Sequence, residues 1–256
     1  MRTVPGLLIP AFFSVIVCFA EAAYPDFLIR PYILDTDTES CTAAFHLKEP
    51  MPAEVRVSTP EGIKIFRSES SSKSHFIRIT GLENSRAYPY QVVCGDGGIK
   101  TDIKAGNNLI KTASLPGEAF SFVVYGDTRP GETGTDSFHR EVISRASAVE
   151  PSFALILGDM VDSGRNPSHW QAFFEAEAPL MKKAAVFPVM GDNDYENGRG
   201  LVTKYFPMLK RGYYKFKWGD IWFFALNTWD TRGDQPREDF DSDSEQMLWL
   251  KQELAR

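Results

Sequence analysis

The sequence predicts an all-β sandwich followed by an α/β domain. Residues 27–113 contain seven short β-prone runs separated by turn residues, which is the pattern of a β-sandwich. From residue 119 onward, β runs alternate with helical patterns, which indicates a mostly parallel sheet covered by helices. Leu115-Pro116-Gly117 is a turn signal between these two secondary-structure patterns. The expected domains therefore span residues 24–114 and 118–256.

The composition is that of a folded protein, with 43% hydrophobic and 24% charged residues. This supplies enough apolar side chains for a core and excludes a disordered chain. The net charge is −6, and the sequence contains no run of Lys or Arg. We therefore expect no nucleic-acid partner, because such a partner requires a basic patch.

Residues 1–22 have the features of a signal peptide. A positive charge comes first, Gly6–Ala20 is almost wholly apolar, and Ala20-Glu21-Ala22 has the small-x-small pattern of a signal peptidase site. The apolar run is too short to cross a bilayer comfortably, so we expect no stable membrane span. The prediction is a secreted or periplasmic protein. Cys18 leaves a lipoprotein as the alternative, which Val17 disfavours because a small residue usually stands there.

The β runs of the first domain alternate apolar and polar residues, as half-buried strands do. The expected strands are Phe27–Leu34, Cys41–Leu47, Ala53–Ser58, Ile63–Arg67, His75–Thr80, Tyr88–Cys94 and Asn108–Ala113. His46 and His75 lie on these strands, and we interpret them as polar strand residues without a ligand role.

Cys41 and Cys94 would remain after removal of the signal peptide, and two cysteines in an oxidising compartment suggest a disulfide. The strand order argues against it, since the second and sixth strands of a seven-stranded sandwich run in the same direction. Cys41 would open the second strand and Cys94 would close the sixth, so the pair would lie beyond the roughly 7 Å Cα limit for a bridge. A shifted register would restore the bridge as the alternative.

The second domain is expected to contain three parallel strands, two covering helices, a hairpin and a last helix. The ranges are Ala119–Tyr125, Phe138–Val149, Phe153–Leu157, Pro167–Leu180, Ala185–Val189, Gly212–Trp218 with Ile221–Leu226, and Asp243–Leu254. His139 and His169 fall on the two helices, where we expect solvated positions.

Three β runs of the second domain end in Gly-Asp. The aspartates are Asp127, Asp159 and Asp192, which lie 32 and 33 residues apart, close to the length of one βαβ unit. Because the carboxyl ends of parallel strands share one sheet edge, the three carboxylates should converge there. Close carboxylates repel, so a hard divalent cation is their natural partner. A single Gly-Asp is more often a turn, as we expect for Gly219-Asp220 between two β runs.

These segments resemble the motifs of the calcineurin-like metallophosphoesterases. That family carries a strand-end Gly-Asp, then Gly-Asp-x-x-Asp, then Gly-Asn-His followed by Asp or Glu. The matching segments are Gly126-Asp127, Gly158–Asp162 and Gly191–Asp194. The preceding β domain is similar to the one that purple acid phosphatases carry in front of their catalytic domain. Within it, Gly81–Tyr88 resembles the tyrosine corner of a fibronectin type III domain.

The resemblance implies a role for each matching residue. Asp127 stands at a terminal metal ligand, Asp159 at the carboxylate that bridges two metals, and Asp192 where an asparagine normally binds the second metal. Asn193 replaces the histidine that contacts the substrate, and it can donate a hydrogen bond but cannot act as an acid. Arg129 replaces a histidine found in many members. Its planar fork suits phosphate oxygens, with a surface arginine as the alternative.

The implied function is hydrolysis of a small phosphate ester by a hydroxide held between two divalent metal ions (Fe, Zn or Mn). The family's further histidine ligands, in His-x-Pro and Gly-His-x-His segments, do not occur before Arg256. We therefore expect a chain truncated at its C-terminus, with low activity on its own. The alternative is a secreted binding or structural protein that keeps the fold with a degenerate, inactive site.

Overall fold

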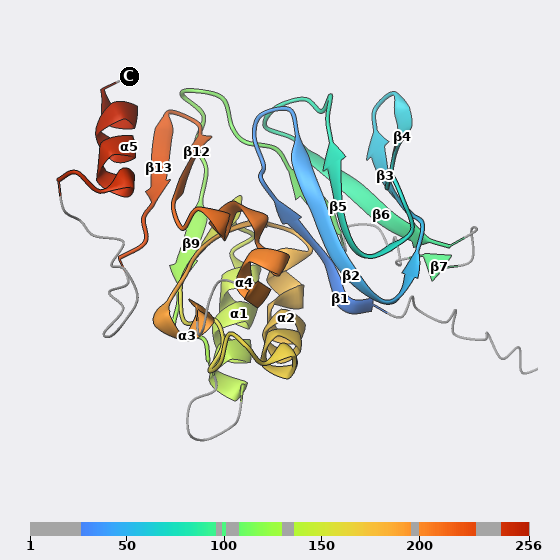
Figure 1. The fold of residues 1–256 in the computed structure, drawn as a ribbon. Helices are drawn as coiled ribbons and strands as arrows, with labels where there is room; N and C mark the ends of the chain where they lie inside the picture. Colours follow the sequence, from blue (N-terminus) through green and yellow to red (C-terminus); the bar gives the residue numbers. More distant parts are fainter. Residues whose placement is uncertain are drawn as a thin grey trace, which may run out of the picture.

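The computed structural model of the chain describes residues 27–95, 99–100, 108–129, 136–195, 200–228 and 242–255. The predicted signal peptide lies outside these residues. Figure 1 shows a β-sandwich beside a layer of helices and strands, so the predicted fold class is confirmed. None of the helices in the described ranges combines the length and apolar character that crossing a membrane requires.

Two sheets form the sandwich. One contains β1 (Phe27–Leu34), β2 (Cys41–Met51) and β5 (Ser72–Ile79). The other contains β3 (Ala53–Thr59), β4 (Gly62–Arg67), β6 (Ala87–Cys94) and β7 (Ile99–Lys100), and β8 (Leu109–Lys111) also pairs with β6. Alternate residues of the strands point inward, so that Phe45, Val55 and Tyr90 are buried in one core between the sheets.

The corner expected at Tyr88 is present, because its hydroxyl accepts a hydrogen bond from the backbone N–H of Glu83 at 2.9 Å. The fibronectin type III identity of the sandwich stays a prediction. Cys41 and Cys94 are both buried free thiols. Burial raises the pKa of Cys41 to about 12 and that of Cys94 to about 11, so both thiols stay protonated and inert.

The second region alternates strands and helices as predicted. Its elements are β9 (Phe122–Tyr125), α1 (Ser137–Ala148), β10 (Phe153–Leu157), α2 (Pro167–Met181), β11 (Ala185–Val189), α3 (Asp192–Tyr195), α4 (Gly200–Tyr205), the 3-10 helix η2 (Pro207–Lys210), β12 (Tyr214–Trp218), β13 (Ile221–Ala225) and α5 (Glu245–Leu254). Helix α2 begins after Asn166, whose side chain accepts a hydrogen bond from the N–H of Ser168 at 3.0 Å, and Pro167 occupies its first turn. Gly219-Asp220 forms the β12–β13 turn, as expected.

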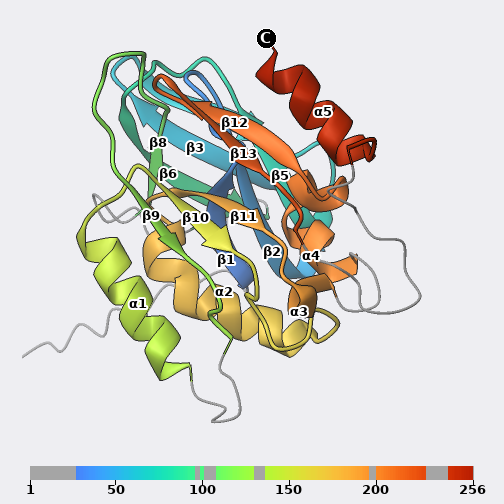
Figure 2. The same ribbon diagram turned by 90° about the vertical axis from the view of Figure 1, so that its left-hand side faces the viewer.

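Strands β9, β10 and β11 are parallel. The inner strands β10 and β11 are covered on both faces, whereas the edge strand β9 leaves Phe122 and Val124 exposed. Ala154, Ile156 and Val186 pack against α1 and α2, whereas Phe153 and Phe187 pack against the β12–β13 hairpin. Figure 2 shows the helices and the hairpin on opposite sides of these strands. Burial on both faces explains why β10 and β11 appear in the sequence as short, continuous apolar runs.

The sandwich and the α/β layer share one sheet, in the order β5-β2-β1-β11-β10-β9. Strand β1 pairs in parallel with β11, with Ile33 opposite Ala185. Helix α2 packs on β1 as well, since the rings of Tyr32 and Phe174 lie 5.0 Å apart. The two regions therefore bury a common core, and the division into residues 24–114 and 118–256 stays a prediction.

Candidate functional site

The three Gly-Asp segments lie where β9, β10 and β11 end. The register pairs Tyr125 with Ile156 and Leu157 with Val189, so that the residues following these strands start at the same edge. The loops after β9 and β10 are then joined directly, because Asp127 N–H donates to the Gly158 carbonyl at 2.9 Å. The parallel sheet thus places the candidate carboxylates at one edge, as the sequence predicted.

Asp127 and Asp159 both adopt left-handed backbone conformations, with φ of 54° and 51°. Such conformations cost roughly 1–3 kcal/mol for a non-glycine residue and cluster at functional sites. Each follows the last residue of its strand by two positions. Both side chains reach Arg129, which contacts Oδ1 of Asp127 and Oδ2 of Asp159.

Glycines allow the ends of β10 and β11 to approach each other closely. A Cβ added to Gly158, which has φ of 81°, would lie 2.6 Å from the Gly191 nitrogen. A Cβ added to Gly191 would lie 2.0 Å from Oδ1 of Asp159. The carboxylate of Asp159 therefore occupies the space that any larger residue at position 191 would fill.

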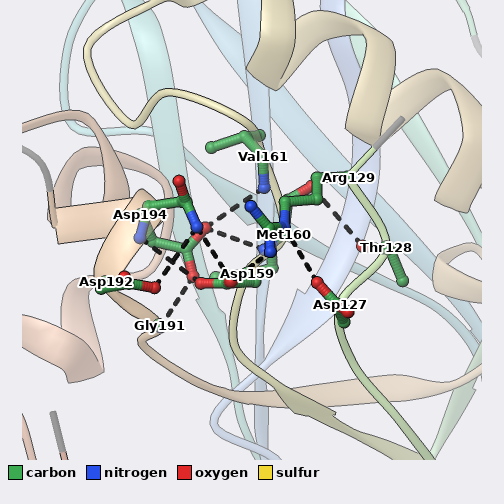
Figure 3. Close-up of polar contacts among 10 residues, drawn as sticks. Asp127, Thr128, Arg129, Asp159, Met160, Val161, Gly191, Asp192 and Asp194 are labelled. Carbon is green, nitrogen blue, oxygen red and sulfur yellow. Dashed lines mark hydrogen bonds and ion pairs between the residues drawn. The ribbon is translucent and has the colours of Figure 1, made fainter. Parts of the chain in front are cut away.

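All five site residues predicted from the sequence are brought together by polar contacts, part of which Figure 3 shows. Nε of Arg129 donates to Oδ1 of Asp127 at 2.9 Å, and its Nη2 lies 3.4 Å from Oδ2 of Asp159. Nδ2 of Asn193 donates to Oδ2 of Asp159 at 2.9 Å and to Oδ1 of Asp192 at 3.3 Å. One guanidinium and one amide thus connect three carboxylates.

The site carries an excess of negative charge. Burial raises the pKa of Asp159, and the neighbouring Asp192 carboxyl raises it further, because adjacent anionic groups resist ionisation. The hydrogen bond to Asp127 and the charges of Asp159 and Asp192 raise the pKa of Arg129. The arrangement favours a positive charge between the ends of β9 and β10.

The site lies within the part of the chain that matches a known protein family. The family described as Calcineurin-like phosphoesterase matches residues 120–255. The chain belongs to this family. The matched segment begins two residues before β9 and contains the three strand-end Gly-Asp segments of this calcineurin-like phosphoesterase.

Two solved structures have a similar fold. One is the structure of PhoD, whose sequence is 14% identical to this chain. The two structures superpose with a TM-score of 0.64, and the match covers 85% of this chain and 55% of that chain. Purple acid phosphatase PPD1 from yellow lupin (Lupinus luteus) seeds is 14% identical with a TM-score of 0.67, over 88% of this chain and 48% of that chain. At this identity the similarity establishes the fold alone, and this phosphoesterase chain spans about half the length of both structures. A search of the curated proteins found no match.

The sequence prediction missed Asp194, a buried residue of this phosphoesterase. Its Oδ1 accepts hydrogen bonds from the N–H groups of Met160 and Val161 at 2.9 and 3.3 Å, and its Oδ2 accepts one from Gly191 at 2.9 Å. Burial raises the pKa of Asp194 to about 7. Asp194 therefore ties the loop after β10 to the loop after β11. The sequence signal that could have identified Asp194 is its place as the acidic residue that ends the third motif, Gly191–Asp194.

The prediction of a solvated position for His139 was wrong. Its Nε2 lies 2.8 Å from Oε1 of Glu177, and both side chains are buried between α1 and α2. The other oxygen of Glu177 accepts a hydrogen bond from the hydroxyl of Tyr125 at 2.6 Å, two residues before Asp127. His169 is half-buried on α2. An amphipathic pattern does not reveal that a buried glutamate lies opposite a histidine.

The donor chemistry of the site suits a hard divalent cation, since it consists of carboxylate and amide oxygens. Within the described ranges, however, no group of three or more His, Cys, Asp or Glu side chains is placed to hold a metal ion. The oxygens of Asp127 and Asp159 face Arg129 and Asn193 instead. The residue types fit a metal ion, whereas in this arrangement Arg129 and Asn193 occupy oxygens of the carboxylates.

Proposed function

We propose that the chain is a phosphoester hydrolase that uses two divalent metal ions, iron, zinc or manganese, at the β9–β10–β11 edge. The observation that carries this proposal is the meeting of Asp127, Asp159 and Asp192 beside an arginine and an amide donor. Membership in the calcineurin-like phosphoesterase family supports the reaction class. Because a signal peptide is expected at residues 1–22, we also propose that the protein is secreted or periplasmic.

Divalent ions at such a site supply Lewis-acid activation of water near neutral pH. Asp159 would be the central metal ligand, because it contacts both Arg129 and Asn193 and its side chain is only 19% exposed. Asp127, with a side chain that is 74% exposed, holds the outer position.

Arg129 and Asn193 would bind the phosphoryl group. The guanidinium offers a planar fork that matches two phosphoryl oxygens, and the amide offers a neutral donor from the other side. Asn193 cannot protonate a leaving group, so the leaving group would take its proton from solvent. We expect weak metal binding and low turnover for this chain, because three carboxylates and one amide are few ligands for two ions.

Turnover of p-nitrophenyl phosphate with added Mn²⁺, Zn²⁺ or Fe²⁺ tests the proposal. We expect slow, metal-dependent turnover that Asp159→Asn abolishes. Asp220→Asn is the matched control, because it alters the same dipeptide in the β12–β13 turn, away from the site. Turnover that survives Asp159→Asn would contradict the proposal.

A binding or structural protein with an inactive site is the second candidate. Two observations favour it: Asn193 stands in the histidine position of the motif, and Arg129 already contacts both Asp127 and Asp159. This candidate predicts a folded chain that neither binds Mn²⁺ nor hydrolyses p-nitrophenyl phosphate. Binding that Asp159→Asn weakens would reject it.

A further inference from the structure

Arg129 lies between two strand ends and contacts a carboxylate from each. Its Nε donates to Oδ1 of Asp127 at 2.9 Å, and its Nη2 lies 3.4 Å from Oδ2 of Asp159. Its backbone is held at the same place, because the N–H of Arg129 donates to the Asp159 carbonyl at 3.3 Å. The side chain therefore starts at the site, and its head group bridges the two aspartates.

The oxygens that Arg129 contacts are those that a divalent ion would need. An ion bound to Asp127 and Asp159 would take hydrogen-bond acceptors away from the guanidinium and would repel its positive charge at short range. Both cations cannot occupy this place together. The excess of carboxylate charge attracts either of them, so the site holds one or the other.

The contact of Arg129 can also be broken at low cost. Its side chain is 39% exposed and that of Asp127 is 74% exposed, and exposed ion pairs contribute little to stability. Among the described residues, the contacts of its head group are to these two carboxylates. A freed guanidinium would remain tethered beside the site, where an anionic group could meet it.

We propose that Arg129 is a displaceable counter-ion that competes with divalent metal for Asp127 and Asp159. With a metal ion on Asp127 and Asp159, the guanidinium would be free to bind a tetrahedral dianion such as a phosphate monoester. The inference rests on the proposed function, since it concerns the same edge of the sheet. Because linkage is reciprocal, the anion and the metal must strengthen each other's binding through Arg129.

Calorimetric titration with Mn²⁺ tests this competition without any measurement of turnover. Arg129→Gln should bind Mn²⁺ about tenfold more tightly than the wild type, which is within the usual range of coupling between two sites. Sulfate, a tetrahedral dianion, should increase the Mn²⁺ affinity of the wild type and leave that of Arg129→Gln unchanged. Arg140→Gln is the control, because Arg140 forms a comparable exposed pair with Asp136 on α1 and should behave as the wild type.

The outcomes separate this inference from the function on which it rests. An Mn²⁺ affinity that Asp159→Asn lowers but Arg129→Gln leaves unchanged or weakens would overturn the competition and keep the metal site. An affinity that Asp159→Asn does not affect, or no binding by either the wild type or Arg129→Gln, would overturn both. Circular dichroism of each variant confirms that the fold is kept.

Discussion

The carboxylate of Asp194 accepts a hydrogen bond from the backbone N–H of Met160 at 2.9 Å and thereby links the loops after β10 and β11. Since Val161 and Gly191 donate to the same carboxylate, one buried side chain orients the backbone that carries Asp159 and Asp192. The geometry of the candidate site therefore depends on a residue that lies beneath it.

Asp194→Ala should destabilise the fold, because two buried and one half-buried N–H donors lose their acceptor. The expected loss is about 3 kcal/mol in the free energy of unfolding. That loss corresponds to a melting temperature lower by about 6–12 °C for a chain of this size. Asp192→Ala is the matched control at a neighbouring, exposed aspartate, and it should change the melting temperature little. Similar melting temperatures for the two variants would contradict this role of Asp194.

Glu177→Ala should destabilise the packing of α1 and α2 on β9. The substitution leaves the hydroxyl of Tyr125 and the imidazole of His139 without their buried partner. We expect a loss of about 3–5 kcal/mol, measured by chemical denaturation. Glu175→Ala removes an exposed glutamate of the same helix and should be nearly neutral. Equal effects of the two substitutions would mean that the buried contacts contribute nothing to stability.

Gly191→Ala should displace the carboxylate of Asp159, since the added methyl group would lie 2.0 Å from its Oδ1 and 2.4 Å from its backbone nitrogen. Any Mn²⁺ affinity of the site should fall at least about tenfold, the scale on which supporting contacts affect metal binding. Gly200→Ala is the control, because a Cβ there meets no atom within 4 Å and lies at the start of α4. A Gly191→Ala chain with unchanged affinity would show that the close approach is not needed.

His46 should make the fold sensitive to mild acid. Burial, together with the charges of Lys204 and His75, lowers its pKa from 6.5 to about 3. The folded state therefore keeps a neutral imidazole that the unfolded state protonates, and its contribution to stability is present above pH 6.5 and lost as the pH falls toward 3.

By pH 5 the loss from His46 should be about 2 kcal/mol. His46→Gln should flatten the decline between pH 6.5 and 5 in denaturation curves, although it removes the contacts to Tyr32 and Ser74 at 3.3 and 2.9 Å. An unchanged slope in that variant would assign the acid sensitivity to other groups.

Local patterns were sufficient for much of this fold. The ranges of β1, β10 and β11 agree with the sequence prediction because their apolar runs end at clear turn residues. Helices α3 and α4 were missed, since four and six residues are too short to show a helical period. The meeting of the three Gly-Asp segments could be predicted because parallel strands place their ends together.

Contacts between distant segments could not be predicted in this way. Nothing in the local sequence of β1 identifies β11 as its neighbour, because the pairing depends on the faces that the helices and the other strands leave open. The burial of His139 likewise depends on Glu177, which lies on a different helix. Asp194 was available as an acidic motif residue, but its three backbone partners come from two loops that only the folded sheet brings together.

The pairing of β1 with β11 affects the order in which the molecule can fold. Strand β1 is synthesised early, yet Ile33 finds its neighbour Ala185 only after 152 further residues have followed. Contacts between such distant segments slow folding, because the intervening chain must be closed before the pairing stabilises it. Until β11 arrives, one edge of β1 lacks its final neighbour, and an open edge of this kind can pair with another nascent chain. Conditions that delay completion of the α/β layer should therefore reduce the yield of folded protein through aggregation of its N-terminal strands.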